Sequence, residues 1–243
     1  MARTVDPVAH AVRRDAFLDV AQRLIQTRGY AQLSIQDVLD DLQVSKGAFY
    51  HYFDSKAALL DGVVSRMVEA ATASLAPAVA DPRRSALQKF DAVFSGLASF
   101  KAERRDLILA LIQVWLSDDN AIVREKFRRG VLVQMTPPVA TIIRQGVAEG
   151  SFTAASPDDA ARVFVSLIMG ANEAAVDLFV AHQAGAVTFD EAERTLTAFA
   201  DAFERILGAR PGSLGFADRS AVVREWFDPS TPAVRSDVQR ELA

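Results

Sequence analysis

Two Ser-Lys pairs, Ser45-Lys46 and Ser55-Lys56, flank the run Phe-Tyr-His-Tyr-Phe. Each serine stands where a helix is expected to begin, because its hydroxyl can accept a hydrogen bond from a free amide of the first turn. Each lysine then adds a positive charge to a helix end that is already partly positive. A phosphate would remove this mismatch, because helix N-termini bind phosphates and a lysine adds a full charge at the same place. The stretch therefore predicts a surface that binds the phosphates of DNA.

The polar side chains between the two pairs are expected to share one side of a short helix. On a helical wheel of residues 46–53, one side carries Ala48, Phe49 and Tyr52, which should pack on the rest of the domain. The opposite side carries Lys46, Gly47, Tyr50 and His51. There is no acidic residue between Leu42 and Phe53. Taken singly, each of these residues is more ordinary as a solvated or core side chain, so the interpretation depends on their combination.

Three helices are expected to position the polar side of residues 46–53, and a fourth helix follows them. The first is expected over roughly Val8–Arg28 and ends at Gly29, and the second begins at a capping box formed by Ser34 and Asp37. The second helix should end near Leu42, the third should run from Ser45 to near Phe53, and a fourth should run from Ser55 to about Leu75. Two short helices joined by a tight turn behind a longer helix form a helix-turn-helix.

The segment YAQLSIQDVLDDLQVSKGAFYHYFDSKAALL resembles the DNA-binding domain of the TetR family of transcriptional regulators over roughly residues 13–62. The resemblance implies that Lys46 and Gly47 read base edges. It also implies a set of phosphate contacts, namely Ser34, Ser45, Tyr50, His51, Tyr52 and Lys56. Two positions depart from the family pattern. Gln43 stands where a glycine usually supplies a left-handed backbone, and Leu39 stands where alanine is usual.

The remainder of the chain also has helical periodicity, and no sustained alternation typical of a strand is present. Helices are expected over about 85–101, 105–117, 120–149, 157–183 and 189–207, with a kink at Pro138 in the third. The expected fold is all-α, with a helix-turn-helix domain at 1–55, an effector-binding and dimerisation domain at 56–209 and a tail at 210–243. The tail could contain short helices at Asp218–Phe227 and Pro232–Leu242.

A ligand pocket is expected where apolar helices carry a few polar groups, as small-molecule sites do. Its predicted lining consists of Gln113 and Trp115 together with Phe164, Ile168, Met169 and Asn172. Taken singly, each aromatic residue in this set is more ordinary as part of the core than as a pocket residue. A ligand bound among these residues would be largely apolar.

Apolar residues in the last long helix are spaced 3-4-3-4-3, beginning at Phe189 and passing through Ala192. The other members of this seam are Leu196, Phe199, Phe203 and Ile206. This spacing is typical of a coiled-coil interface. The preceding helix carries small residues that allow a close approach, so the two helices could form a homodimer across a two-fold axis. Ordinary packing within one chain is the alternative.

Composition excludes several classes of site and partner. The 243 residues carry a net charge of −4 and include no cysteine, which excludes disulfides and thiolate metal sites and fits a cytoplasmic location. No cofactor is expected, and the run Leu107–Leu116 is too short to cross a membrane. Common catalytic motifs are absent, so an enzyme is not expected. The sequence predicts a repressor that a small apolar ligand releases from a palindromic operator. The alternative is a helical protein-interaction module whose first three helices are only structural.

Overall fold

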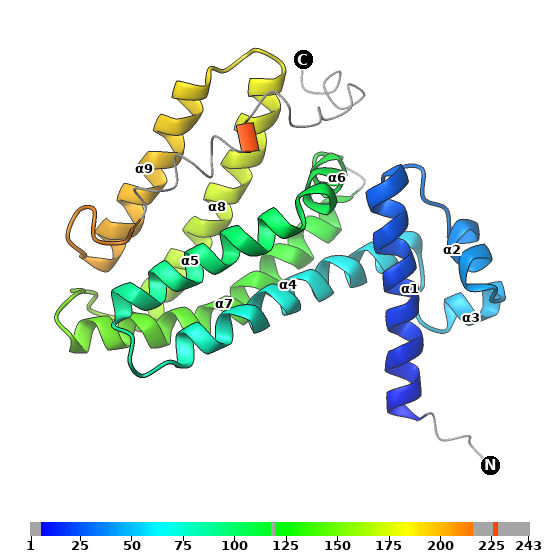
Figure 1. Ribbon diagram of the computed structural model, residues 1–243, viewed down its shortest axis with the longest axis horizontal. Coiled ribbons are helices and arrows are strands. Elements are labelled where there is room, and N and C mark those ends of the chain that lie inside the picture. Colours follow the sequence, from blue (N-terminus) through cyan, green and yellow to red (C-terminus); the bar gives the residue numbers. More distant parts are fainter. Residues whose placement is uncertain (1–5, 118–119, 216–225, 228–243) are drawn as a thin grey trace. The chain divides into compact units, whose positions relative to one another are not determined.

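The computed structural model describes residues 6–117, 120–215 and 226–227, and within these ranges it contains helices and no strands (Figure 1). The helices are α1 (Pro7–Arg28), α2 (Ile35–Leu42), α3 (Lys46–Tyr50), α4 (Lys56–Ala80), α5 (Ala86–Glu103), α6 (Arg105–Trp115), α7 (Ala121–Ala148), α8 (Pro157–Gln183) and α9 (Phe189–Leu207). The predicted all-α class is confirmed.

The chain forms two compact units. The first consists of Met1–Glu69 and Arg104–Phe127, and the second of Ala70–Glu103 and Arg128–Ala243. Both α4 and α7 therefore contribute residues to both units. The predicted division of function at residue 55 stays a prediction, because compactness alone does not assign a function to either unit.

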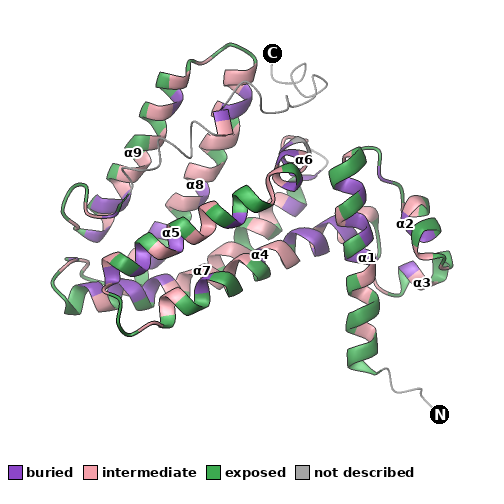
Figure 2. Ribbon diagram, viewed as in Figure 1, coloured by how far each residue is buried: buried purple, intermediate pink, exposed green. Residues whose placement is uncertain are grey.

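The first unit has a core built around one side of α1. Phe17, Leu18 and Ala21 follow each other at helical spacing and are almost completely buried. They share one apolar cluster with residues from α2, α3, α4, α6 and α7, including Val38, Phe49, Leu59, Leu60, Leu107 and Val123. In Figure 2 the N-terminal part of α1 is mostly exposed, whereas its C-terminal part carries the buried stripe. This packing holds the two short helices α2 and α3 against α1.

The caps predicted for the helix-turn-helix are present. The Ser34 hydroxyl accepts from the Asp37 amide while the Asp37 carboxylate accepts from the Ser34 amide, which forms the predicted capping box. The Ser45 hydroxyl accepts from the Ala48 amide at 3.3 Å. Helix α3 ends at Tyr50, three residues before the predicted end. The amides of Tyr52 and Phe53 both donate to the Phe49 carbonyl, so the chain turns here and the helix does not continue.

The turn between α2 and α3 contains a left-handed residue. Gln43 has φ 52° and ψ 45°, and it is the one residue other than glycine with a positive φ in the described part of the chain. The amide of Val44 donates to the Leu39 carbonyl across this turn. The Leu39 side chain is buried in the core of the first unit. Gln43 thus adopts the left-handed backbone itself, and Leu39 is accommodated in the core.

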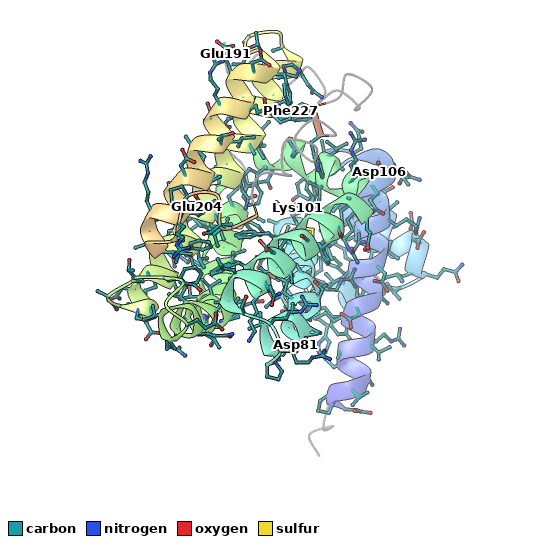
Figure 3. All side chains as sticks on the ribbon, turned by 60° about the vertical axis from the view of Figure 1, so that its left-hand side comes forward. Asp81, Lys101, Asp106, Glu191, Glu204 and Phe227 are labelled. Atoms are coloured by element: carbon teal, nitrogen blue, oxygen red, sulfur yellow. The ribbon has the colours of Figure 1, made fainter. Side chains whose placement is uncertain are left out.

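The second unit has an aromatic core between α5, α7, α8 and α9. The rings of Phe90, Phe94, Phe164 and Phe203 form a continuous set, with the Phe164 and Phe203 centroids 4.9 Å apart. Figure 3 shows Glu191 at the start of α9 and Glu204 toward its end. The buried Glu204 carboxylate accepts from the amides of Gly212 at 2.8 Å and Leu214 at 3.1 Å. This carboxylate fixes the chain that follows α9.

Several boundaries differ from the predictions. Helix α4 continues past Leu75 to Ala80 and contains Pro77, because Leu75 and Val79 pack into the second core. Helix α7, by contrast, runs through Pro137 and Pro138 as one element close to its predicted bounds, and the kink at Pro138 stays a prediction. Ser156 stands at the N-cap of α8 as predicted, but its hydroxyl donates to the Asp159 carboxylate and does not cap a helix amide.

Little of the tail belongs to the described residues. The predicted short helices at Asp218–Phe227 and Pro232–Leu242 lie outside the described residues, apart from Trp226 and Phe227. Phe227 is buried, and its ring lies 5.8 Å from that of Phe179 and 6.1 Å from that of Phe189. The expectation that this part of the tail docks on the body of the protein is confirmed for Phe227.

Candidate nucleic-acid interface

Helix α3 has the two sides that the helical wheel predicts. Phe49 is completely buried, and its ring lies 5.8 Å from that of Phe17 on α1. Ala48 and Tyr52 are half-buried. The opposite side is exposed and carries Lys46, Gly47, Tyr50 and His51. One buried phenylalanine thus anchors the helix and leaves its cation, phenol and imidazole in solvent.

The carboxylates of the neighbouring helix are engaged elsewhere. Arg28 pairs with Asp37 at 3.4 Å, and Arg23 pairs with Asp41. Lys46 itself forms no ion pair among the described residues, and its Nζ lies 5.9 Å from the centre of the Tyr50 ring. The exposed side of α3 therefore keeps its positive charge.

Lys56, the first residue of α4, is held in place within the first unit. Its Nζ lies 4.3 Å from the centre of the Tyr30 ring and donates to the Ala31 carbonyl at 3.4 Å. Burial lowers the pKa of the Lys56 ammonium, and the Asp37 carboxylate opposes this effect. Lys56, which is predicted to contact a phosphate, is thus a half-buried lysine that already has partners within the chain.

The hydroxyls that are predicted to donate to phosphate differ in whether their proton is already used in a hydrogen bond. The Ser34 hydroxyl donates to the Asp37 carboxylate, so its proton is already used inside the capping box. The Ser45 hydroxyl only accepts a bond from Ala48, which leaves its proton for an external oxygen. The Tyr52 ring lies between the rings of Phe17 at 5.5 Å and His10 at 4.6 Å. Of these three, Ser45 is the hydroxyl best placed to donate.

Comparison with known proteins finds a family match for this arrangement. Residues 17–63 match the family described as bacterial regulatory proteins, tetR family. The predicted resemblance of this segment to the tetR family is confirmed. The matched segment contains the buried stripe of α1, the capped α2, the exposed side of α3 and the start of α4.

Two relatives extend the similarity beyond this segment. The HTH-type transcriptional regulator EthR of Mycolicibacterium smegmatis is 27% identical over 142 residues, which cover 51% of this chain and 65% of the relative. The alignment thus spans just under two thirds of that protein. The HTH-type transcriptional repressor KstR2 of the same organism is 29% identical over 154 residues, covering 60% of this chain and 70% of the relative.

Solved structures share the fold of this chain. A TetR transcription regulator from Haloarcula marismortui matches with a TM-score of 0.57 and 21% identity, over 82% of this chain and 97% of the other. A TetR-family regulator from Syntrophomonas wolfei matches with a TM-score of 0.55 and 18% identity, over 80% and 96% of the two chains. At this level of identity the likeness concerns the fold alone.

The residues predicted to line a ligand pocket belong to different units of the chain. Trp115 is in the first unit, where its ring meets that of Phe127 at 4.8 Å, and the Gln113 side chain lies outside the described residues. The other four residues, Phe164, Ile168, Met169 and Asn172, lie on α8 in the second unit. Phe164 is completely buried in the aromatic core. The four predicted pocket residues on α8 thus belong to one unit, and the pocket as a whole stays a prediction.

Asn172 has a partner that the sequence analysis missed. Its side-chain oxygen accepts from the Lys101 Nζ of α5 at 2.9 Å. Figure 3 shows Lys101 extending from α5. A lysine and an amide on facing helices give the α8 group a polar end. The sequence contains no local signal for this contact, because the two residues lie far apart along the chain.

The predicted dimer seam on α9 meets α8 of the same chain for part of its length. Phe203 is buried against Phe94 and Phe164, so its side chain serves the core of its own unit. Phe199 lies over Gly170 of α8, where a methyl group would be 3.9 Å from its ring. Phe189, Leu196 and Ile206 are half-buried. Homodimerisation stays a prediction, and part of the seam packs within its own chain.

Two residues near the exposed side of α3 were not singled out from the sequence. Tyr30 holds Lys56, and His10 of α1 contacts both Tyr52 and His51. His10 precedes Phe17 by two helical turns, so the stripe of α1 already placed it on the side that faces α3. This spacing could have identified His10, whereas nothing local identifies Tyr30.

Proposed function

We propose that this chain is a transcriptional regulator that binds double-stranded DNA with the exposed side of α3 and represses the genes near its site. One observation carries the proposal. Helix α3 is anchored by the buried Phe49 and presents Lys46, Gly47, Tyr50 and His51 to solvent, in a segment without acidic residues. Relatives named as transcriptional regulators and repressors support the same conclusion.

The exposed residues have distinct roles in this proposal. Lys46 reaches the acceptors of guanine in the major groove, and Gly47 lets the backbone come close to the bases. Phosphate contacts carry no sequence information but fix the position of the helix. They are assigned to Ser45, Tyr50, His51, Tyr52 and Lys56, while Ser34 contributes only if its bond to Asp37 is exchanged.

The proposed binding form is a homodimer on a palindromic operator, with its two recognition helices about 34–36 Å apart. Helix α8 supports this. Its most apolar stretch is long and apolar enough to resemble a membrane span, yet only 28% of that stretch is buried within one chain. Val163 on α8 is 53% exposed. A second subunit would cover this apolar surface of α8. In the proposed cytoplasmic DNA-binding protein, the partner subunit and not a membrane shields it from water.

The proposed signal is a small and largely apolar ligand bound near Ile168, Met169 and Asn172. These residues combine apolar surface with the polar pair formed by Asn172 and Lys101. A ligand that prefers a form of the dimer with another spacing of the recognition helices would weaken DNA binding. Coupling of this kind is typically about 1–3 kcal/mol, or roughly 5–150-fold in affinity.

A gel shift with fragments of the DNA upstream of the chain's own gene tests the proposal. We expect a discrete shifted band at low nanomolar to micromolar protein that excess unlabelled random DNA does not remove. The double variant Lys46→Ala/Lys56→Ala should lose this band while it keeps the wild-type circular dichroism spectrum. A chain that binds no fragment, or a double variant that binds as well as the wild type, would favour the interaction-module alternative.

A further inference from the structure

We propose that Lys89 of α5 anchors the carboxylate of an apolar acid and that the ligand of this chain belongs to this chemical class. The inference deepens the proposed function, because it rests on the proposed control of DNA binding by a largely apolar ligand. Lys89 lies in the second unit, as do the predicted pocket residues on α8. None of those α8 residues is charged, so they leave the charge of the ligand open.

Lys89 lies in the apolar core of its unit. Only 5% of the residue is exposed, and among the described residues it is the one lysine or arginine that is buried. Its neighbours on the same side of α5, namely Ala86, Phe90 and Val93, are buried as well. Lysine is almost never buried to this degree unless its charge is paired. The ammonium of Lys89 therefore needs a partner.

The described part of the chain does not supply this partner. Within it the Lys89 side chain forms no ion pair, no hydrogen bond and no contact with an aromatic ring. The unpaired Nζ atom is also not completely closed off from solvent, so a solute can reach it. A charge taken out of water is costly unless an opposite charge or hydrogen bonds compensate it. An external anion that meets the Nζ atom would provide this compensation.

The carboxylates beside the start of α5 are engaged elsewhere. Glu149 accepts a hydrogen bond from the Ala86 amide at 2.9 Å, one turn before Lys89. Asp81 forms an ion pair with Arg83 at 3.0 Å. Neither carboxylate forms an ion pair with Lys89. The anion that compensates Lys89 is therefore expected to come from outside the chain.

The surroundings of Lys89 favour an anion with an apolar body. The ring of the next residue, Phe90, lies 5.1 Å from that of Phe164 on α8. Phe164 and Ile168 are one helical turn apart and both pack in the apolar cluster that contains Phe90. This turn of α5 is thus continuous with the α8 residues predicted for the pocket. An inorganic anion would leave the apolar surface unused, and a neutral ligand would leave the ammonium unpaired.

The charge of the ligand should be visible in its affinity. A hydrogen bond between an ammonium and a carboxylate is roughly twice as strong as one between neutral groups. An alcohol with the same apolar body keeps the hydrophobic contribution and loses the charged contact. The difference between the two ligands therefore measures the contribution of Lys89, and we expect it to be about tenfold or more in affinity.

The test is isothermal titration calorimetry of the full chain at neutral pH. The probes are decanoate and naphthoate, one flexible and one flat acid, and their neutral controls are decanol and naphthylmethanol. We expect at least one acid to bind about tenfold or more tightly than its alcohol. Acids that do not bind, or that bind no better than their alcohols, overturn the inference without any variant.

The variants assign the preference for the acid to Lys89. Lys89→Met keeps the length of the side chain and removes its charge, so it should bind acid and alcohol alike. Its unfolding temperature should not fall below that of the wild type, because an uncompensated buried charge is removed. Arg83→Met removes an exposed cation of the same unit and should keep the wild-type preference. A wild-type preference in Lys89→Met, or in Lys89→Gln should the first variant not fold, overturns the inference.

A gel shift with upstream DNA in the presence of the bound acid separates this inference from the proposed function. Loss of the shifted band with the wild type, and not with Lys89→Met, supports both. A band that persists although the acid occupies the Lys89 site overturns the assignment of the acid as the controlling ligand, while DNA binding stands. A chain that binds the acid through Lys89 but binds no upstream DNA rejects the proposed function and leaves the carboxylate site in place.

Discussion

The ammonium of Lys56 lies 4.3 Å from the centre of the Tyr30 ring and donates to the Ala31 carbonyl. The first residue of α4 is thereby held against the segment that joins α1 to α2. An exposed lysine loses much of its rotamer freedom when it grips a phosphate. Lys56 has already lost part of this freedom in the folded protein, so the phosphate contact that we propose for it costs less side-chain entropy.

Lys56→Ala should weaken binding to all DNA sequences alike and lower the slope of log affinity against log salt by about one unit, because one phosphate contact is removed. Tyr30→Leu should weaken binding less and keep the slope, because the charge remains while its support is lost. The effects of both variants are measured by fluorescence anisotropy titrations at several salt concentrations. A wild-type slope in Lys56→Ala would remove this lysine from the contact set.

Lys46→Ala should also relax the preference between DNA sequences, because a lysine in the major groove distinguishes guanine by about 1–3 kcal/mol. The measurement compares affinity for the upstream site with affinity for single-base variants of it. Arg83→Ala removes one charge from an exposed side chain of the second unit and serves as the charge-matched control. Unchanged discrimination in Lys46→Ala would assign that lysine to phosphate.

The helix-turn-helix could be predicted because its determinants are local. Ser34 and Asp37 form a capping box within four residues, and Ser45 caps α3 within its first turn. The buried side of α3 also followed from spacing alone, since Phe49 and Tyr52 recur at helical period. Caps and periodicity are read from neighbours along the chain, so the sequence carries them directly.

The contacts between elements could not be predicted in the same way. Periodicity identifies the apolar side of α9 but not its partner, and Phe203 belongs to the core of its own unit. The length of α4 past Pro77 depends on Leu75 and Val79 packing on other helices. The engagement of Lys56 by Tyr30 likewise depends on how a loop lies against a helix. Such relations depend on tertiary packing, which overrides local preference.

Gln43→Gly should stabilise the protein by about 0.5–1 kcal/mol, because the left-handed backbone is disfavoured by a Cβ atom and glycine lacks one. Gln43 is exposed, so little packing is lost with its side chain. Urea unfolding measures the change. Gln36→Gly, inside the neighbouring helix, should instead destabilise by about 1 kcal/mol. Equal effects of the two substitutions would contradict the turn geometry.

Gly146 and Gly130 lie in the same helix α7 and should respond oppositely to alanine. A methyl group at Gly146 would come 2.0 Å from the Phe152 ring, whereas nothing lies within 4 Å of one at Gly130. Gly146→Ala should therefore destabilise by about 1–3 kcal/mol through overpacking. Gly130→Ala should stabilise by about 0.4–1 kcal/mol, because it restricts the unfolded chain. Thermal unfolding of both variants measures these changes in stability. A Gly146→Ala variant as stable as the wild type would show that the Phe152 ring can move aside.

The capping box of α2 predicts a pH-dependent stability. The hydroxyl and the amide of Ser34 both donate to the Asp37 carboxylate, and with the nearby Arg28 they lower the pKa of Asp37 below its ordinary value. The ionised carboxylate therefore stabilises the folded state above about pH 4, and this contribution is lost as the pH falls through the lowered pKa. Asp37→Asn should lower the unfolding midpoint at neutral pH, with a difference that shrinks as the solution is acidified.

In a Ser34→Ala background the Asp37→Asn substitution should have a smaller effect, because the two groups act as one unit. A midpoint difference that stays constant from neutral to acidic pH would mean that the charge of Asp37 does not support the cap.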